Sequence, residues 1–175
     1  MPRLIGPAPR YEFAVEGYVQ ALIWSPDSGQ LFAASAEGEV ALFDIENGRR
    51  NWRNDGHGLG TASIDVAKKS EIAASVGQDN ELRVYETSSG HVIATATLPS
   101  WGERVSFSPN EKNLAVASAK EVLIFSTTEL LAADGRSVPP VSRFGPHEST
   151  VTDITWDPRD PDRLAATAYG ALTLW

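Results

Sequence analysis

The stretch GQDNELRVYE, residues 77–86, concentrates side chains that can do chemistry. Asp79, Asn80 and Glu81 are consecutive, and Glu86 ends the stretch. Carboxylate and amide oxygens bind hard cations, and two neighbouring carboxylates can serve as a general acid and a general base. The same residue types also form tight turns, because Asp and Asn side chains hydrogen-bond to nearby backbone groups. Three interpretations are therefore open: a metal site, an acid–base pair, or a turn between two strands.

The two chemical interpretations of this stretch lack supporting residues. A hard cation needs six or more oxygen ligands from a closely spaced loop, and no second cluster of acids lies nearby in the sequence. The chain has no G-x-S-x-G elbow, no Walker-type glycine-rich loop, no H-E-x-x-H pair and no cysteine. We therefore expect no metal, no cofactor and no catalytic residue. An enzyme that gathers acids from several loops is the competing hypothesis.

Composition and charge disfavour several other classes of protein. The 175 residues carry a net charge of −8, and basic residues occur in short pairs such as Arg49-Arg50 and Lys68-Lys69. A nucleic-acid backbone is repelled by such a surface, so we expect no nucleic acid as partner. No apolar run approaches the roughly 20 residues of a membrane-spanning helix, so we expect no membrane partner. The N-terminus lacks an apolar signal region and the chain lacks cysteine, which together predict a cytoplasmic protein.

The elements that must position these residues recur along the chain. A strand ending in a bulky residue, a turn and a second strand rich in Ala form the repeated unit. Three clear copies and one fainter copy are ALIWSPDSGQLFAAS (21–35), RVSFSPNEKNLAVAS (104–118), DITWDPRDPDRLAAT (153–167) and SIDVAKKSEIAAS (63–75). Their first strands end at Trp24, Val66, Phe107 and Trp156, at intervals of 42, 41 and 49 residues.

Each copy continues with a third strand, and three copies have a fourth. The third strands are EVALFD, ELRVYE, EVLIFS and ALTLW, and the fourth strands are RRNWRN, HVIATATL and VSRF. The insertion TTELLAADGRSVPP, residues 127–140, lengthens the third copy between its third and fourth strands. Four strands per ~40 residues is typical of propeller blades. The sequence therefore predicts an all-β fold, a β-propeller of four-stranded antiparallel blades with about four blades present as a partial ring.

The period, the strand order and the aromatic ends of the third strands resemble the WD-repeat β-propeller family. GHG and PHE correspond to the Gly-His pair of the family's repeats. Their histidines, His57 and His147, each lie 28 residues before the aromatic residue of a third strand, Tyr85 and Trp175. The resemblance covers residues 11–175, although no repeat carries a literal Trp-Asp pair.

The resemblance implies a buried, hydrogen-bonded tetrad in the second repeat. Its members are His57, Ser75, Asp79 and Tyr85, where Tyr85 takes the place of the family's Trp. A buried carboxylate needs several donors, which a His and the amides of a tight turn supply. Because Tyr85 has a hydroxyl where Trp has an indole N–H, we expect Tyr85 not to reach the tetrad partner that the family's Trp contacts. The other repeats carry different residues at the Asp position: Glu37, Ala119 and Tyr169.

The strand pattern divides the chain into a tail and four blades. Residues 1–10 form the N-terminal tail, and YEFAVE, residues 11–16, is predicted as a clasp strand that completes the last blade, as in the family. The blades are predicted at 17–55, 56–98, 99–145 and 146–175, the last one being partial. The family's rings of about seven blades need roughly 300 residues. We therefore expect a fragment of a longer propeller, with an eight-bladed ring of two copies and a closed four-blade ring as alternatives.

The resemblance also implies a function, that of a non-catalytic scaffold for protein–protein interaction. WD-repeat modules present the loops of a propeller face to a protein or peptide partner, and the acidic chain favours a basic partner segment. Self-association through open blade edges is a further expectation. The competing functions are a propeller-type hydrolase with a site at the central channel and a regulatory or sensory module of a larger protein.

Candidate partner-binding residues lie in two kinds of connection that share one face of a propeller. These connect the fourth strand to the next first strand, and the second strand to the third. The candidates are Tyr18, Gln78, Trp101 and Glu148. Trp101 is the strongest of them, because aromatic residues are enriched at interfaces and no strand requires its burial. On the opposite face, Leu130 and Leu131 of the insertion are a second candidate.

Overall fold

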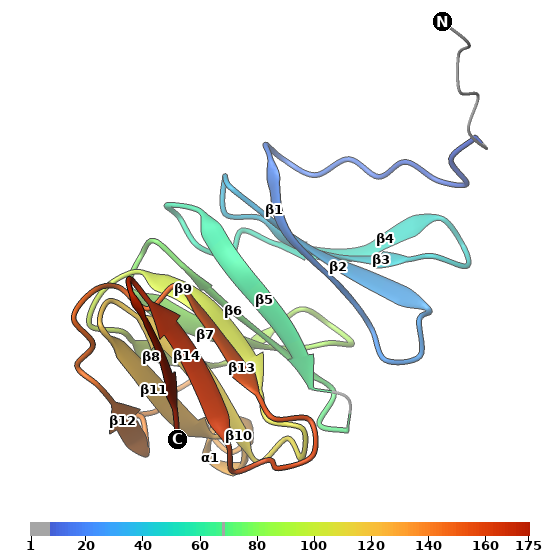
Figure 1. Cartoon of the computed structure of the whole chain (residues 1–175). Coiled ribbons are helices and arrows are strands. Elements are labelled where there is room, and N and C mark those ends of the chain that lie inside the picture. The colour runs from blue at the N-terminus through green and yellow to red at the C-terminus, as the bar shows by residue number, and fades with distance from the viewer. Residues whose placement is uncertain (1–7, 68) are drawn as a thin grey trace, which may run out of the picture.

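The structure is a computed structural model that describes residues 8–67 and 69–175, and most of its regular elements are β-strands (Figure 1). Four antiparallel sheets follow one another along the chain, which confirms the predicted fold class. We number these sheets as blades 1 to 4. In each blade the strands lie in the order in which they occur in the sequence.

The strand bounds agree closely with the predicted repeats. Blade 1 contains β1 (Val19–Trp24), β2 (Gln30–Ser35), β3 (Val40–Asp44) and β4 (Arg49–Asn54). Blade 2 contains β5 (Thr61–Ala67), β6 (Ile72–Gly77), β7 (Glu81–Glu86) and β8 (Val92–Thr97). Blade 3 contains β9 (Gly102–Phe107), β10 (Asn113–Ser118), β11 (Glu121–Ser126) and β12 (Ser142–Phe144). Blade 4 contains β13 (Asp153–Trp156), β14 (Leu164–Ala168) and β15 (Ala171–Leu174).

The first strands of neighbouring blades lie against one another and define two faces of the array. β1 lies against β5, β5 against β9, and β9 against β13 (Figure 1). Because successive strands run in opposite directions, the loops that enter the first strands share one face with the turns between second and third strands. We call this the loop face. The turns between first and second strands, and between third and fourth strands, form the opposite face.

Blades pack on one another through apolar clusters between their sheets. Separate clusters join blade 1 to blade 2, blade 2 to blade 3, and blade 3 to blade 4. β6, with the sequence IAASVG, is buried at every position because it lies between two other blades. Small side chains allow this close packing on both sides of a strand. Between blades 1 and 2, Trp52 stacks on Tyr85 and its Nε1 donates to the carbonyl of Thr87 at 2.8 Å.

The array of blades is open within the part of the chain that the structure describes. No apolar cluster in that part joins blade 4 to blade 1. Leu22 and Trp24 on β1, and Leu172 and Leu174 on β15, are exposed on the two outer faces. This open arrangement contradicts the alternative of a closed four-blade ring. The longer propeller and the ring of two copies remain predictions.

The predicted clasp at residues 11–16 does not form a strand, so this prediction is wrong. Its alternating apolar residues face blade 1 instead: Phe13 and Val15 pack on a cluster that contains Ala33 and Phe43. The rings of Phe13 and Phe43 have centroids 4.6 Å apart. The alternation correctly marks a one-sided apolar segment, but that side covers the outer face of blade 1 rather than pairing with blade 4.

The insertion in blade 3 forms a single helical turn, α1 (Thr127–Leu131). Ser126 caps its N-terminus by accepting a hydrogen bond from the amide of Glu129. Leu130 is buried in the cluster between blades 2 and 3, so it is unavailable as the predicted binding residue, whereas Leu131 is exposed. Within the described ranges, no helix has the length and apolarity needed to cross a bilayer.

Candidate interaction face

A chain of hydrogen bonds in blade 2 links the entering loop to β6 and β7. His57 Nδ1 lies 2.7 Å from Asp79 Oδ1, and His57 Nε2 lies 2.8 Å from Ser75 Oγ. Ser75 Oγ lies 2.9 Å from the hydroxyl of Tyr85. The structure thus brings together all four residues of the predicted tetrad. The expectation that Tyr85 falls short is wrong, because the hydroxyl at the tip of its ring reaches Ser75.

Two glycines make room for His57 where it is enclosed between blades 1 and 2. A Cβ on Gly77 would lie 2.6 Å from the Cβ of His57 and would clash with the carbonyl of Gly60. Gly38 has a φ of 104°, and a Cβ there would clash with the carbonyl oxygen of His57. Glycine is therefore needed at both positions for the entering loop to approach this closely.

Ser75, His57 and Asp79 have the composition of a nucleophilic triad, but their burial argues for a structural role. Ser75 and His57 have no exposed surface. The hydroxyl of Ser75 is also shared between His57 and Tyr85. Because a substrate carbonyl cannot approach an enclosed oxygen, we assign this chain of hydrogen bonds to fixing the entering loop.

Two of the three acids of the stretch 77–86, Asp79 and Glu81, lie beside the guanidinium group of Arg83. Glu81 lies 2.8 Å from Arg83 Nε, and Asp79 Oδ2 lies 3.6 Å from Arg83 Nη2. Asn80 has a φ of 60°, a left-handed conformation that Asn tolerates in tight turns. Among the described residues, no group of three or more His, Asp or Glu side chains is placed to hold a metal ion. The structure therefore favours the turn interpretation of this stretch.

Burial sets the protonation states within the tetrad. It lowers the pKa of His57 below the ordinary value, because loss of solvent penalises the imidazolium more than Asp79 stabilises it. His57 is therefore neutral at pH 7, so its Nδ1–H donates to Asp79 and its Nε2 accepts from Ser75. Burial also raises the pKa of Tyr85 to about 12, so its hydroxyl stays protonated and donates to Ser75.

We expect the free energy of unfolding to fall as the pH is lowered from 7 toward 5. His57 of the unfolded chain takes up a proton near its ordinary pKa of 6.5, whereas the folded chain, with its lowered pKa, does not until a lower pH. Protons therefore favour the unfolded chain over this interval. Urea titrations at pH 7, 6 and 5 measure the effect, and a His57→Ala variant should lose less stability. Equal losses in the two proteins would contradict this expectation.

Blades 1 and 3 fix their entering loops with other side chains. In blade 1, the buried Glu39 accepts a hydrogen bond from the amide of Glu16 at 2.8 Å and pairs with Arg50 at 3.4 Å. In blade 3, the hydroxyl of Ser118 bonds to the amide and the carbonyl of Ser100 at 3.2 and 2.9 Å. Three different arrangements therefore hold the three corresponding loops.

An exposed apolar side chain follows each of these fixed points. In the entering loops of blades 1, 2 and 3, these side chains are Tyr18, Leu59 and Trp101, which are 82%, 66% and 53% exposed. A fourth, in the turn between β14 and β15, is 88% exposed. We call these four the anchor residues; in that order they are Tyr18, Leu59, Trp101 and Tyr169.

The anchor residues include two that the sequence did not predict as binding residues. All four predicted candidates, Tyr18, Gln78, Trp101 and Glu148, are exposed in connections of the loop face. Leu59 was missed, and its signal is an apolar residue in the glycine-flanked loop directly after His57. Tyr169 was missed because it was matched only to the Asp position of the family's repeat.

A shallow hollow of about 260 Å³ lies on the loop face beside Leu59. Gln78 lines it together with Glu103 and Arg104, so its polar wall carries one charge of each sign. The loop face thus combines exposed apolar side chains with a polar hollow, an arrangement typical of surfaces that bind other proteins.

No protein-family model matches the chain, but curated relatives and solved structures are similar to it. Transcription factor unc-37 of Caenorhabditis elegans is 25% identical over 155 residues, which are 89% of this chain and 24% of the relative. Eukaryotic translation initiation factor 3 subunit I of Neurospora crassa is 29% identical over 111 residues, 62% of this chain and 32% of the relative. Transcriptional corepressor LEUNIG_HOMOLOG of Arabidopsis thaliana is 33% identical over 81 residues, 46% of this chain and 10% of the relative. The chain thus spans a third or less of these relatives.

Two solved structures share the fold over nearly the whole chain. A chain of the mitotic checkpoint complex superposes on this chain with a TM-score of 0.80 and 18% sequence identity. The match covers 94% of this chain and 49% of the checkpoint-complex chain. The computationally designed Ika4 protein superposes with a TM-score of 0.82 and 17% sequence identity. This match covers 97% of this chain and 98% of the Ika4 chain. Together with the relatives, these matches confirm the resemblance to WD-repeat β-propeller proteins.

Proposed function

We propose that the chain is a non-catalytic interaction module that binds a protein or peptide through its loop face. The observation that carries this proposal is the set of exposed apolar anchor residues on fixed loops of successive blades. Binding to an ordered loop costs less conformational entropy than binding to a flexible one. Tyr and Trp also supply large contact areas, which explains their enrichment in the residues that dominate interfaces.

The relatives support a role within larger assemblies. One of them, eukaryotic translation initiation factor 3 subunit I, is a subunit by name. The competing hydrolase hypothesis receives no such support from the loop-face hollow. Its described lining carries a single carboxylate, that of Glu103, and no His, whereas the hypothesis calls for acids or His gathered from several loops.

Replacing Trp101 with Ala is expected to weaken the binding of a loop-face peptide at least about tenfold, because the indole supplies contact area from a fixed loop. A displayed library of random peptides, selected on the wild-type chain, supplies the ligand, and a titration measures its Kd for each variant. Trp24→Ala is the matched control, since both indoles are 53% exposed but Trp24 lies on the outer face of blade 1. The proposal fails if no peptide is enriched, or if only the Trp24 change weakens binding.

A further inference from the structure

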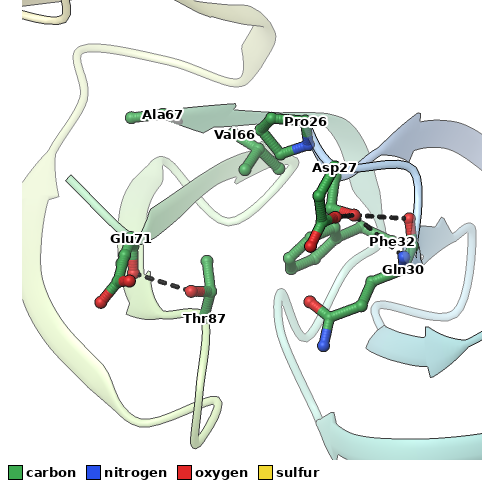
Figure 2. A pocket seen from close by; sticks show the side chains of 9 residues that line it. Pro26, Asp27, Gln30, Phe32, Val66, Ala67, Glu71 and Thr87 are labelled. Carbon is green, nitrogen blue, oxygen red and sulfur yellow. Dashed lines mark hydrogen bonds between the residues drawn. The ribbon is translucent and has the colours of Figure 1, made fainter. Parts of the chain in front are cut away.

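A hollow of about 220 Å³ opens on the opposite face, at the seam between blades 1 and 2 (Figure 2). Its apolar wall consists of Pro26, Phe32, Val66 and Ala67. Asp27 of the β1–β2 turn and Glu71 of the β5–β6 turn, two acidic residues, line it from two different blades (Figure 2). Gln30 and Thr87 add polar groups, and no Lys or Arg belongs to its described lining.

At the next seam, a side chain crosses from one blade to the other. Between blades 2 and 3, the carboxylate of Glu111 crosses the seam and accepts hydrogen bonds from the amides of Lys69 and Ser70. Glu111 lies four residues after Phe107, and the corresponding residue of blade 2 is Ser70, four after Val66. The short hydroxyl of Ser70 is itself bonded to Glu111 at 3.2 Å. The seam between blades 1 and 2 therefore has no corresponding side chain to cross it.

Both carboxylates at the open seam have capacity to accept a cation. Neither Asp27 nor Glu71 takes part in an ion pair among the described residues. Asp27 Oδ1 accepts hydrogen bonds from Ser25 Oγ at 2.6 Å and from the amide of Gly29 at 3.1 Å, which hold the carboxylate in place. These bonds, that of Ser25 foremost, lower the pKa of Asp27, so it is ionised at neutral pH.

We infer that the hollow at this seam binds a basic side chain, that of Arg or Lys, from a peptide partner. The apolar wall suits the methylene stem of such a side chain, and the carboxylates of Asp27 and Glu71 suit its charged head. The volume lies below the ~300 Å³ at which small-molecule pockets begin, so it suits one side chain rather than a larger ligand. The chain's net charge of −8 also attracts a basic segment.

This inference concerns the opposite face and does not depend on the anchor residues. A partner held at the seam hollow leaves the loop face free, so the two sites can be tested separately. Failure of the seam hollow to bind a basic side chain leaves the loop-face proposal unaffected, and the reverse also holds.

The test uses two peptides that differ only in charge, acetyl-Gly-Arg-Gly-amide and its citrulline counterpart. Each is titrated into the ¹⁵N-labelled 175-residue chain, and amide chemical shifts report where it binds. We expect the Arg peptide to shift the amides of Gln30, Ala67 and Thr87 in a saturable way. The citrulline peptide should bind at least about tenfold more weakly, because it cannot form charge-assisted hydrogen bonds.

A variant pair checks that the two carboxylates are responsible. Asp27→Asn combined with Glu71→Gln should weaken the binding of the Arg peptide by about the same factor as replacing Arg with citrulline in the peptide does. Glu12→Gln combined with Glu129→Gln removes the same charge from exposed positions elsewhere and should leave the Kd within about twofold. Shifts located elsewhere, equal binding of the two peptides, or no saturable shift would overturn the inference. The peptide comparison on the wild-type chain decides the question even if the double variant fails to fold.

Discussion

Replacing His57 with Ala is expected to lower the free energy of unfolding by about 3–5 kcal/mol. The imidazole occupies a site without exposed surface, so its removal leaves a cavity between blades 1 and 2. It also leaves the hydroxyl of Ser75 and the carboxylate of Asp79 without the partners they have at 2.8 and 2.7 Å. Urea denaturation at pH 7, followed by circular dichroism, measures the change.

His91→Ala is the matched control for this variant. His91 is exposed just before β8, so its loss should change the free energy of unfolding by no more than about 0.5 kcal/mol. A loss below about 1 kcal/mol in His57→Ala would mean that the hydrogen-bond chain contributes little to the stability of blade 2.

The double replacement Tyr18→Ala and Trp101→Ala is expected to raise the Kd of a loop-face peptide ~100-fold or more, which corresponds to a loss of about 2.7 kcal/mol of binding free energy. Tyr18 enters blade 1 and Trp101 enters blade 3, with blade 2 between them. Their loops are fixed separately, one by Glu39 and the other by Ser118. The two losses should therefore add to within about 0.5 kcal/mol, as for independent sites. A titration of wild type, both single variants and the double variant measures the sum.

The control for the double variant is Leu22→Ala combined with Trp24→Ala. Both residues are exposed on β1 at the outer face of blade 1, so this change removes a comparable exposed apolar area away from the loop face. We expect the control to alter the Kd by less than about threefold. A double variant that binds as tightly as either single variant would show that the peptide uses only one of the two loops.

Strand positions were predictable from the sequence because a buried strand leaves a strong local pattern. The alternation around Trp24, Phe107 and Trp156 marks first strands, and the structure ends β1, β9 and β13 at these residues. The same alternation at residues 11–16 led to a wrong prediction. An apolar, alternating segment identifies the side that is buried, but it does not identify what buries it. Here Phe13 packs on Phe43 and no sheet partner is available.

The tetrad was predictable because the resemblance supplied the four positions, whereas the other fixed loops were not. Glu39 and Glu16 are 23 residues apart, and Ser118 and Ser100 are 18 apart. The 18-residue spacing recurs in blade 2, where His57 and Ser75 are bonded, but Ser100 stands where blade 2 has the His, so residue type did not mark this bond. Blade 1 uses a different spacing, so the repeat did not mark its bond either. The reach of Tyr85 depends on the distance between β6 and β7, which residue types alone do not specify. The seam hollow was missed for the same reason, because it lies between turns that are about 40 residues apart in the sequence.

The most direct test of the central claim is a hydrogen-exchange map of the chain with and without a library-selected peptide. We expect slower exchange in the entering loops that carry Tyr18, Leu59 and Trp101, within 17–20, 57–61 and 99–103. We expect unchanged exchange in the turns of the opposite face, within 25–30 and 127–137. Protection confined to the opposite face, or to the outer strands β1 and β15, would contradict the assignment of the loop face as the protein-binding surface.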